Sequence, residues 1–170
     1  MSHPLVIALF DDADAAGRAA KALRGLGVPA DRVSIVAQTH DEEGILAKAA
    51  DASPGSEIED WRPASRLGEL GAHLIAAVAL VMPGIGPIVA NGPLAAGLGE
   101  AAGHLTGGIA RSLERAGLSA SVAEDWENRV GEGAVLIGGH ASSPVEAEAV
   151  RSLLTGAGAS RVTACSWPDR

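Results

Sequence analysis

The pattern of apolar and polar residues repeats at the two ends of the chain. Each copy has an apolar run, polar residues, a stretch of helical period, a glycine turn and a second apolar run. Residues 5–28 align without a gap on residues 136–159, at an offset of 131 positions. We predict strands and helices in that order, with the strands over 5–10, 33–37, 135–139 and 162–166. Two such copies predict a ferredoxin-like split βαβ sandwich of the α+β class, with four antiparallel strands and two helices on one face.

Polar residues follow the first strand of each copy and predict helix N-caps. Asp11 and Asp12 offer carboxylate oxygens in the first copy, and Ser143 with Glu146 fits a capping box in the second. We expect the first and third strands to be central neighbours that run parallel, which would bring Asp11 and Asp12 beside residues 140–143. A helix N-terminus favours anions, but the aspartates already supply negative charge there. We therefore interpret these residues as caps rather than as a ligand site.

The segment between the copies predicts an insertion that interrupts the sandwich. Residues 38–66 are polar and acidic and indicate a linker, with at most a short helix near 44–50. Residues 67–130 are rich in glycine and alanine and end in an amphipathic stretch over 119–130, a short helix that Trp126 would pack onto the rest. The predicted organisation is one domain in two halves, 1–37 and 131–170, around the linker 38–66 and the insertion 67–130.

The insertion predicts a helical hairpin. Residues 70–99 contain no Asp, Glu, Lys or Arg, and the run is apolar on every side. A helix over about 65–81 would have to end near Pro83, because proline has no N–H and clashes with the preceding turn. A second helix can begin at Pro93 and continue to about Ala116. The two arms would then meet at a Pro-Gly tip.

Small residues at every fourth position indicate that the arms of the hairpin pack closely. Glycine destabilises a helix interior by about 0.8–1.0 kcal/mol per residue, so a stripe of glycines needs a packing reason. Such stripes let two helix backbones approach each other. We predict a homo-oligomer, most simply a dimer, with hairpin against hairpin. Its interface residues would be Ala72, Ala76, Gly99, Gly103 and Gly107.

Two other environments for the apolar segment remain open. Residues 70–90 are long enough for a membrane span, but prolines 83 and 87 interrupt them, and a single span would separate the two copies. Only a re-entrant hairpin would keep both copies on one side, and its return arm carries Glu100, His104 and Arg111. Alternatively, the segment packs on the open face of its own sheet.

Composition excludes several classes of protein. The net charge of −8 and a pI near 5.0 argue against nucleic-acid binding, which requires a basic face. The same charge disfavours a polybasic membrane-surface protein. A single cysteine, Cys165, allows no disulfide and is expected to be a small core residue. Without a recognisable signal peptide we expect a cytoplasmic protein, with membrane association as the alternative.

The sequence offers no constellation typical of catalysis. It has no G-x-S-x-G elbow, no phosphate-binding loop and no pair of histidines spaced i, i+4. His73 and His104 lie on opposite arms of the predicted hairpin and could bind a metal with Glu69 or Glu100, although isolated polar surface residues are the simpler interpretation. Trp167 is expected in the C-terminal tail. We predict no enzyme activity and no cofactor.

The insertion resembles a known family. PGIGP followed by GPLAA, within residues 83–141, is similar to the hallmark of bacterial general stress proteins, also called heat-induced stress proteins. The order of elements is also similar, over about residues 4–37 and 68–166. This resemblance implies a stress-linked bacterial protein and no known catalytic residues.

Three functions therefore compete. The first is a non-enzymatic stress-associated protein that self-associates through its hairpin. The second is a peripheral or re-entrant membrane-associated stress protein. The third is a ferredoxin-like regulatory module that senses a small ligand or a metal, for which fold analogy is the only support.

Overall fold

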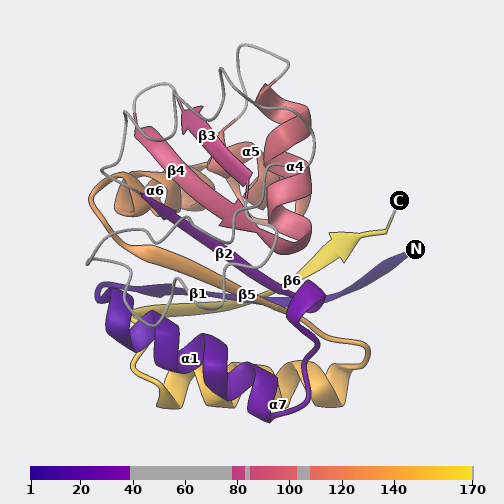
Figure 1. The fold of residues 1–170 in the computed structure, drawn as a ribbon. Coiled ribbons are helices and arrows are strands. Elements are labelled where there is room, and N and C mark those ends of the chain that lie inside the picture. The colour runs from indigo at the N-terminus through magenta and orange to yellow at the C-terminus, as the bar shows by residue number, and fades with distance from the viewer. Residues whose placement is uncertain (39–77, 83–84, 103–107, 170) are drawn as a thin grey trace, which may run out of the picture.

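A computed structural model describes residues 1–38, 78–82, 85–102 and 108–169, with the backbone alone for 78–82, 87 and 99–102 (Figure 1). The fold is α+β. In chain order the strands are β1 (Ser2–Phe10), β2 (Val33–Gln38), β3 (Val78–Met82), β4 (Gly86–Asn91), β5 (Val135–His140) and β6 (Arg161–Pro168). The helices are α1 (Ala13–Gly25), the 3₁₀ turn η1 (Ala30–Arg32), α4 (Gly92–Ala102), α5 (Ile109–Arg115), α6 (Ala120–Gly131) and α7 (Pro144–Gly156).

The six described strands form one antiparallel sheet in the order β3-β4-β2-β5-β1-β6. The two copies of the repeat contribute to the same sheet, and β1 lies beside β5, as the sequence predicts. Their predicted parallel direction is wrong, since Leu5 pairs with His140 and Phe10 with Val135. Within one copy the strands β1 and β2 leave a gap, and β5 fills this gap antiparallel to both. Asp11 and residues 140–143 therefore follow opposite ends of the sheet.

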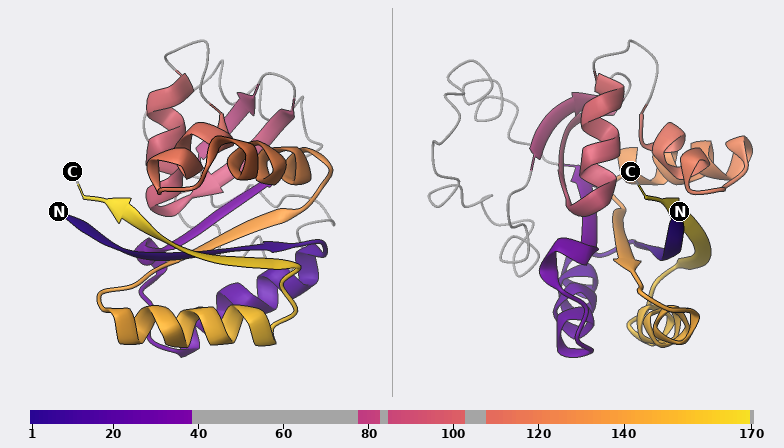
Figure 2. Two further views of the ribbon diagram at one scale, coloured as in Figure 1. Left: turned by 180° about the vertical axis from the view of Figure 1, so that it is seen from behind. Right: turned by 90° about the vertical axis from the view of Figure 1, so that its right-hand side faces the viewer.

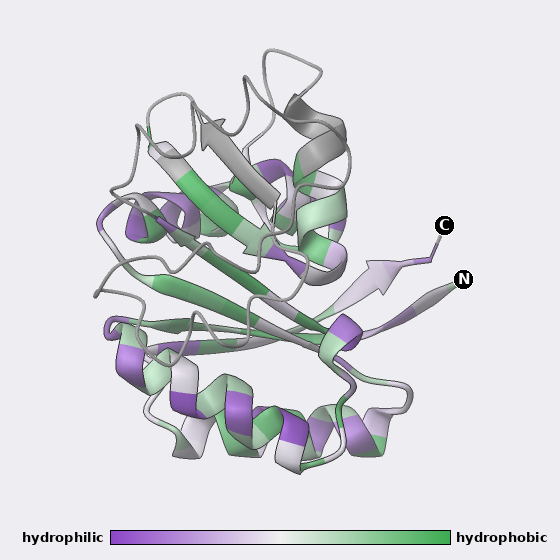
Figure 3. Ribbon diagram, in the orientation of Figure 1, coloured by the Kyte–Doolittle hydropathy of each residue, from purple (hydrophilic) through white to green (hydrophobic). Residues whose placement is uncertain are grey.

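Helices cover both faces of the sheet. Helices α1 and α7 lie on one face and α4, α5 and α6 on the other (Figure 2). Every residue of β1 from Leu5 to Phe10 is buried, and successive side chains enter opposite clusters: Leu5 lies with α4–α6 and Val6 with α1 and α7. A strand buried on both faces is mostly apolar rather than alternating, which explains the green colour along much of the central strands in Figure 3.

The first arm of the predicted helical hairpin differs from the structure where it is described. Residues 78–82 form β3, which pairs with β4 in an antiparallel hairpin; residues 65–77 lie outside the described part of the chain. Valine and isoleucine are frequent in both segments, and β-branched residues favour strands. Strand pairing also gives hydrogen-bond partners to the backbone. Gly86, at the start of β4, has φ +94°, a conformation that favours glycine.

The second arm is divided between two helices. Helix α4 begins beside Pro93, as predicted, but the continuous helix predicted to Ala116 is wrong. Gly108 is extended, with φ −85° and ψ −154°, and α5 begins after it. Helices α4–α6 bury Leu94, Leu98 and Trp126 against the sheet. These described residues thus pack on the second face of their own sheet, one of the environments that the sequence left open.

The predicted helix caps are confirmed for Asp12 and Ser143, whereas the Asp11 carboxylate instead accepts a hydrogen bond from Arg129. The Asp12 carboxylate accepts hydrogen bonds from the N–H groups of Asp14 and Ala15. The Ser143 hydroxyl accepts one from the Glu146 N–H at 3.2 Å, with proline at the first helical position. The reciprocal bond lies one residue earlier than in a standard capping box, because the Glu146 carboxylate accepts from the Ser142 N–H at 2.7 Å. The short helix predicted over 119–130 is also present as α6.

Candidate functional site

Most residues of the oligomer interface predicted from the sequence lie outside the described part of the chain. Ala72, Ala76, Gly103 and Gly107 are outside the described residues, as are the linker over 39–66 and the histidines 73 and 104. Gly99 lies in α4, but its surroundings are not described. Hairpin association and the predicted domain boundaries therefore remain predictions.

The structure instead brings together polar side chains that sequence spacing could not connect. His3 Nδ1 lies 2.6 Å from Asp169 Oδ1, and His3 Nε2 lies 2.8 Å from His140 Nδ1. His140 Nε2 lies 3.0 Å from Ser34 Oγ, and that oxygen accepts a hydrogen bond from the Leu94 N–H at 3.1 Å. A continuous chain of hydrogen bonds thus runs from Asp169 at the surface to the first turn of α4. We call Ser34, His140, His3 and Asp169 the polar chain.

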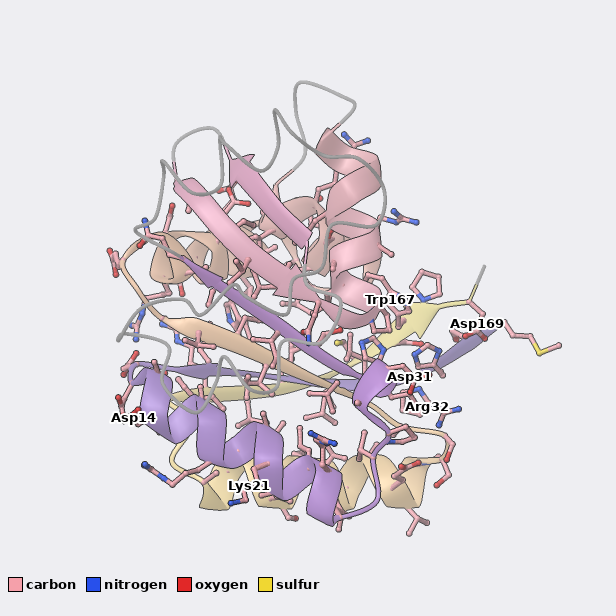
Figure 4. All side chains as sticks on the ribbon, viewed as in Figure 1. Asp14, Lys21, Asp31, Arg32, Trp167 and Asp169 are labelled. Atoms are coloured by element: carbon pink, nitrogen blue, oxygen red, sulfur yellow. The ribbon has the colours of Figure 1, made fainter. Side chains whose placement is uncertain are left out.

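The sheet register places the polar chain at one end of the sheet. His3 pairs with Trp167 across β1 and β6, Leu5 with His140 across β1 and β5, and Val33 with Gly139 across β5 and β2. Strand ends from all four segments of the repeat therefore meet here. Figure 4 shows Trp167 and Asp169 at this end, together with Asp31 and Arg32 of η1.

Glycines let α4 reach the polar chain. Gly92, at the start of α4, has φ +72°, and a Cβ there would lie 2.5 Å from the Val33 carbonyl oxygen and 2.8 Å from Ser34 Oγ. At Gly138 a Cβ would be 3.3 Å from side-chain atoms of both Leu94 and Ser34. The free N–H groups of a helix N-terminus need acceptors, and the Ser34 hydroxyl supplies one from the neighbouring strand.

An aromatic ring and apolar residues exclude water from the inner part of the chain. Trp167, predicted in the tail, is part of β6 and only 8% exposed. Its ring meets His140 edge to face, with centroids 5.8 Å apart and planes at 90°. His140 and Ser34 are 1% and 0% exposed. The chain is therefore buried at Ser34 and open to solvent at Asp169.

Burial and positive charge keep His140 neutral. Burial, as the largest cause, together with the neighbouring His3 and Arg32, lowers the pKa of His140 from its ordinary value of 6.5 to about 3. The ring cannot hold a charge without water or a carboxylate beside it. The His140 ring is therefore uncharged near neutral pH.

One proton arrangement satisfies both rings when they are neutral. An ionised Asp169 carboxylate accepts only, so His3 must donate from Nδ1 and accept at Nε2. His140 then donates from Nδ1 and accepts at Nε2, where the Ser34 hydroxyl donates to it. The Ser34 oxygen still accepts from Leu94. Each polar atom of the chain has a partner in this state.

A small cavity of about 240 Å³ gives access to the outer end of the chain. Its walls include helix α4, and His3 and Asp169 lie at its edge. The lining residues are His3, Pro93, Ala96, Gly97, Arg115, Trp167, Pro168 and Asp169. Protons and small solutes can therefore reach His3, whereas Ser34 stays inaccessible.

The signals for this site were visible in the sequence but not interpretable. His3 and His140 are 137 positions apart, so no local spacing connects them.

Cys165, expected in the core, is partly buried against the α4–α6 cluster, and burial raises its pKa to about 12. Among the described residues, no group of three or more His, Cys, Asp or Glu could hold a metal ion.

No family model, curated protein or solved structure matches this chain. Within the described residues, no helix has both the length and the apolar character that a membrane crossing requires.

Proposed function

We propose that this chain is a non-catalytic, stress-associated module that responds to acidification through the polar chain. The observation that carries the proposal is the continuous set of hydrogen bonds from Asp169 to the Leu94 N–H. The resemblance of residues 83–141 to general stress proteins supports the context of stress. Of the three functions considered above, this proposal corresponds to the regulatory module that senses a small ligand, and the ligand is a proton.

The four repeat strands support a ferredoxin-like relationship for this module. Their order, β2-β5-β1-β6, places the first strands of both copies at the centre, and α1 and α7 lie together on one face. Strands β3 and β4 then extend the β2 side of the sheet. Ferredoxin-like folds carry many functions, so the argument for sensing rests on the polar chain.

Proton uptake at His3 would rearrange the buried end of the polar chain. A positively charged His3 donates from both nitrogens, so His140 Nδ1 must become an acceptor and its proton must reside on Nε2. Ser34 Oγ then accepts from both His140 and Leu94, and its hydroxyl proton loses its acceptor. An unsatisfied buried donor costs about 1–3 kcal/mol. The Leu94 N–H still donates to Ser34 Oγ, but the unpaired hydroxyl proton destabilises the closed contact between Ser34 and the first turn of α4, so this turn should open more readily.

The inaccessibility of Ser34 supports a role without catalysis. Serine, histidine and aspartate together have the residue types of a hydrolytic triad, but a nucleophile must reach its substrate. Ser34 is 0% exposed, and its oxygen already accepts the Leu94 N–H. The arrangement is suited to transmitting a proton's effect rather than to attacking a carbonyl.

Nitrogen NMR of the histidine rings tests the proposal directly. We expect both His3 and His140 to carry their protons on Nδ1 near pH 8. On acidification His140 should stay neutral and move its proton to Nε2. The protection of the Leu94 amide against hydrogen exchange should fall over the same pH range.

A matched variant separates this coupling from general acid effects. In Ser34→Ala the Leu94 amide has lost its acceptor, so its protection against hydrogen exchange should be low both near pH 8 and at acidic pH. If His140 keeps its Nδ1 proton on acidification, or if Leu94 protection is independent of pH in the wild-type protein, the proposal is wrong.

A further inference from the structure

Strand β6 is the terminal strand on its side of the sheet (Figure 2), and no other described strand pairs with its outer edge. The Ser166 N–H donates to the Ala116 carbonyl at 3.1 Å, away from β1. Backbone groups of a strand alternate in direction with a period of two. The N–H and C=O groups of Val162 and Ala164 therefore also point outward, and no other described strand lies against them.

A groove runs beside this edge. It has a volume of about 670 Å³ and lies between β6 and the connection from α5 to α6. Its residues are Ala116, Gly117, Leu118, Ser119, Val122, Thr163, Ala164, Cys165 and Ser166. Val122, at 39% exposed, is one of few large apolar side chains on the described surface. The wall carries no carboxylate, ammonium or guanidinium group, and burial raises the pKa of the Cys165 thiol to about 12, so the thiol is uncharged as well.

We propose that a second copy of this chain pairs its β6 with this edge, antiparallel, about a twofold axis at Thr163. The outward groups of Val162 would meet those of the partner's Ala164, and the outward groups of Ala164 would meet those of the partner's Val162. The two positions lie symmetrically about Thr163, so each copy supplies what the other lacks. This self-complementarity is what a twofold interface requires.

Charge and strand length favour the same partner. The chain carries a net charge of −8, so two copies repel each other over most of their surface. Within β6, residues 162–168 contain no Asp, Glu, Lys or Arg. Two existing hydrogen bonds limit the length of this pairing. The Ser166 N–H already donates to the Ala116 carbonyl, and the Ser160 N–H donates to the Leu9 carbonyl of β1. A short antiparallel match around Thr163 fits between these limits.

This interface is independent of the acid response proposed above and of the hairpin contact predicted from the sequence. It joins two six-stranded sheets across β6, at the side opposite to β3. The polar chain is intact within one copy, so either proposal can fail without the other.

Site-specific disulfide formation tests the axis. In a Cys165→Ser background, Thr163→Cys places two cysteines opposite each other in a pair without backbone hydrogen bonds, where Cα atoms are about 4.5 Å apart. That distance lies within the range for disulfides. We expect rapid oxidation to a covalent dimer. Ala164→Cys in the same background is the matched control, because the partner's Val162 lies opposite, and it should cross-link at least tenfold more slowly.

Light scattering of Ala164→Pro supplies a second, independent test. Proline at this position removes an outward N–H and leaves the bonds from β6 to β1 in place, a substitution that edge strands tolerate. We expect the wild-type protein to be a dimer and this variant a monomer with an unchanged circular dichroism spectrum. A monomeric wild-type protein, a folded Ala164→Pro variant that remains dimeric, or equal cross-linking at both cysteine positions would overturn the proposal.

Discussion

The two halves of the repeat share a backbone plan but differ at the end of their first strands. Residues 7–9 of β1 are Ile-Ala-Leu, and the equivalent residues 138–140 of β5 are Gly-Gly-His. Leu9 is fully buried in the apolar cluster beneath α4–α6. His140 occupies the corresponding place with a polar ring that is equally buried.

The difference shows where the second half departs from simple packing. Position 8 is alanine in the first half and position 139 is glycine in the second, while the helix residues Ala19 and Val150 change size in the opposite direction. A Cβ at Gly139 would lie 2.6 Å from Val150 Cγ1. The strand and helix residues thus compensate in volume, whereas the exchange of Leu9 for His140 introduces polar atoms that only Ser34 and His3 satisfy.

The largest loss of stability is expected when a core residue of the second half is replaced by its counterpart from the first half. Gly139→Ala should destabilise the protein by about 1–3 kcal/mol through overpacking, at the upper end because the contact is so short. Gly139→Ala with Val150→Ala recreates the pair Ala8 and Ala19 and should be less destabilised than the sum of its single variants. Denaturant unfolding of the four proteins measures this. Additive effects would show that the two residues do not compensate.

A somewhat smaller loss is expected when His140 is changed to its counterpart. His140→Leu should destabilise the protein by about 1–2 kcal/mol at pH 7, because the Ser34 hydroxyl loses its acceptor while the leucine gains apolar burial. Adding Ser34→Ala removes the unsatisfied hydroxyl and should recover part of the loss. Unfolding at pH 7 compares the two. A double variant less stable than His140→Leu would contradict the hydrogen-bond account.

The caps of the two halves give the smallest difference. Asp12→Ala and Ser143→Ala should each cost about 0.5–2 kcal/mol. The Asp12 variant should lose more, because its carboxylate accepts from two N–H groups and the Ser143 hydroxyl from one. Thermal unfolding of the two variants ranks them. An unchanged melting temperature for Ser143→Ala would show that this hydroxyl does not stabilise α7.

The sequence predicted the two halves well because their signals are local. Apolar runs, cap residues and glycine turns each specify one element, and the repeat shows that the elements recur. The predicted parallel direction of β1 and β5 was wrong because this direction depends on how the strands of one copy are placed between the strands of the other copy. The helix predicted over residues 78–81 was wrong because a run that is apolar on all sides has no periodicity of apolar and polar residues that would distinguish a strand from a buried helix.

The polar chain could not be predicted for a different reason. Its members come from three strands and from the residue that follows β6, and these meet only after the sheet has formed. The departure of residues 138–140 from the repeat was the available signal, since a histidine opposite a core leucine needs partners that the sequence does not name. The small residues at Gly92 and Gly138 were equally visible, but their purpose depends on the approach of α4 to Ser34.

The pH dependence of stability tests the central claim that His140 is held neutral inside the fold. Its pKa is 6.5 when solvated and about 3 in the folded protein. Between these values the unfolded state binds the extra proton and the native state does not. His140 therefore stabilises the fold above pH 6.5 relative to lower pH, and stability falls as the pH decreases towards 3.

The decisive measurement is the free energy of unfolding from pH 7.5 to pH 4.5 for the wild-type protein and His140→Leu. His3, Arg32, Asp169 and Glu146 are also present near the site, and they are common to both proteins. We predict that wild-type stability falls more steeply below pH 6.5, by up to about 1.4 kcal/mol per pH unit relative to the variant. Parallel curves for the two proteins would contradict the account.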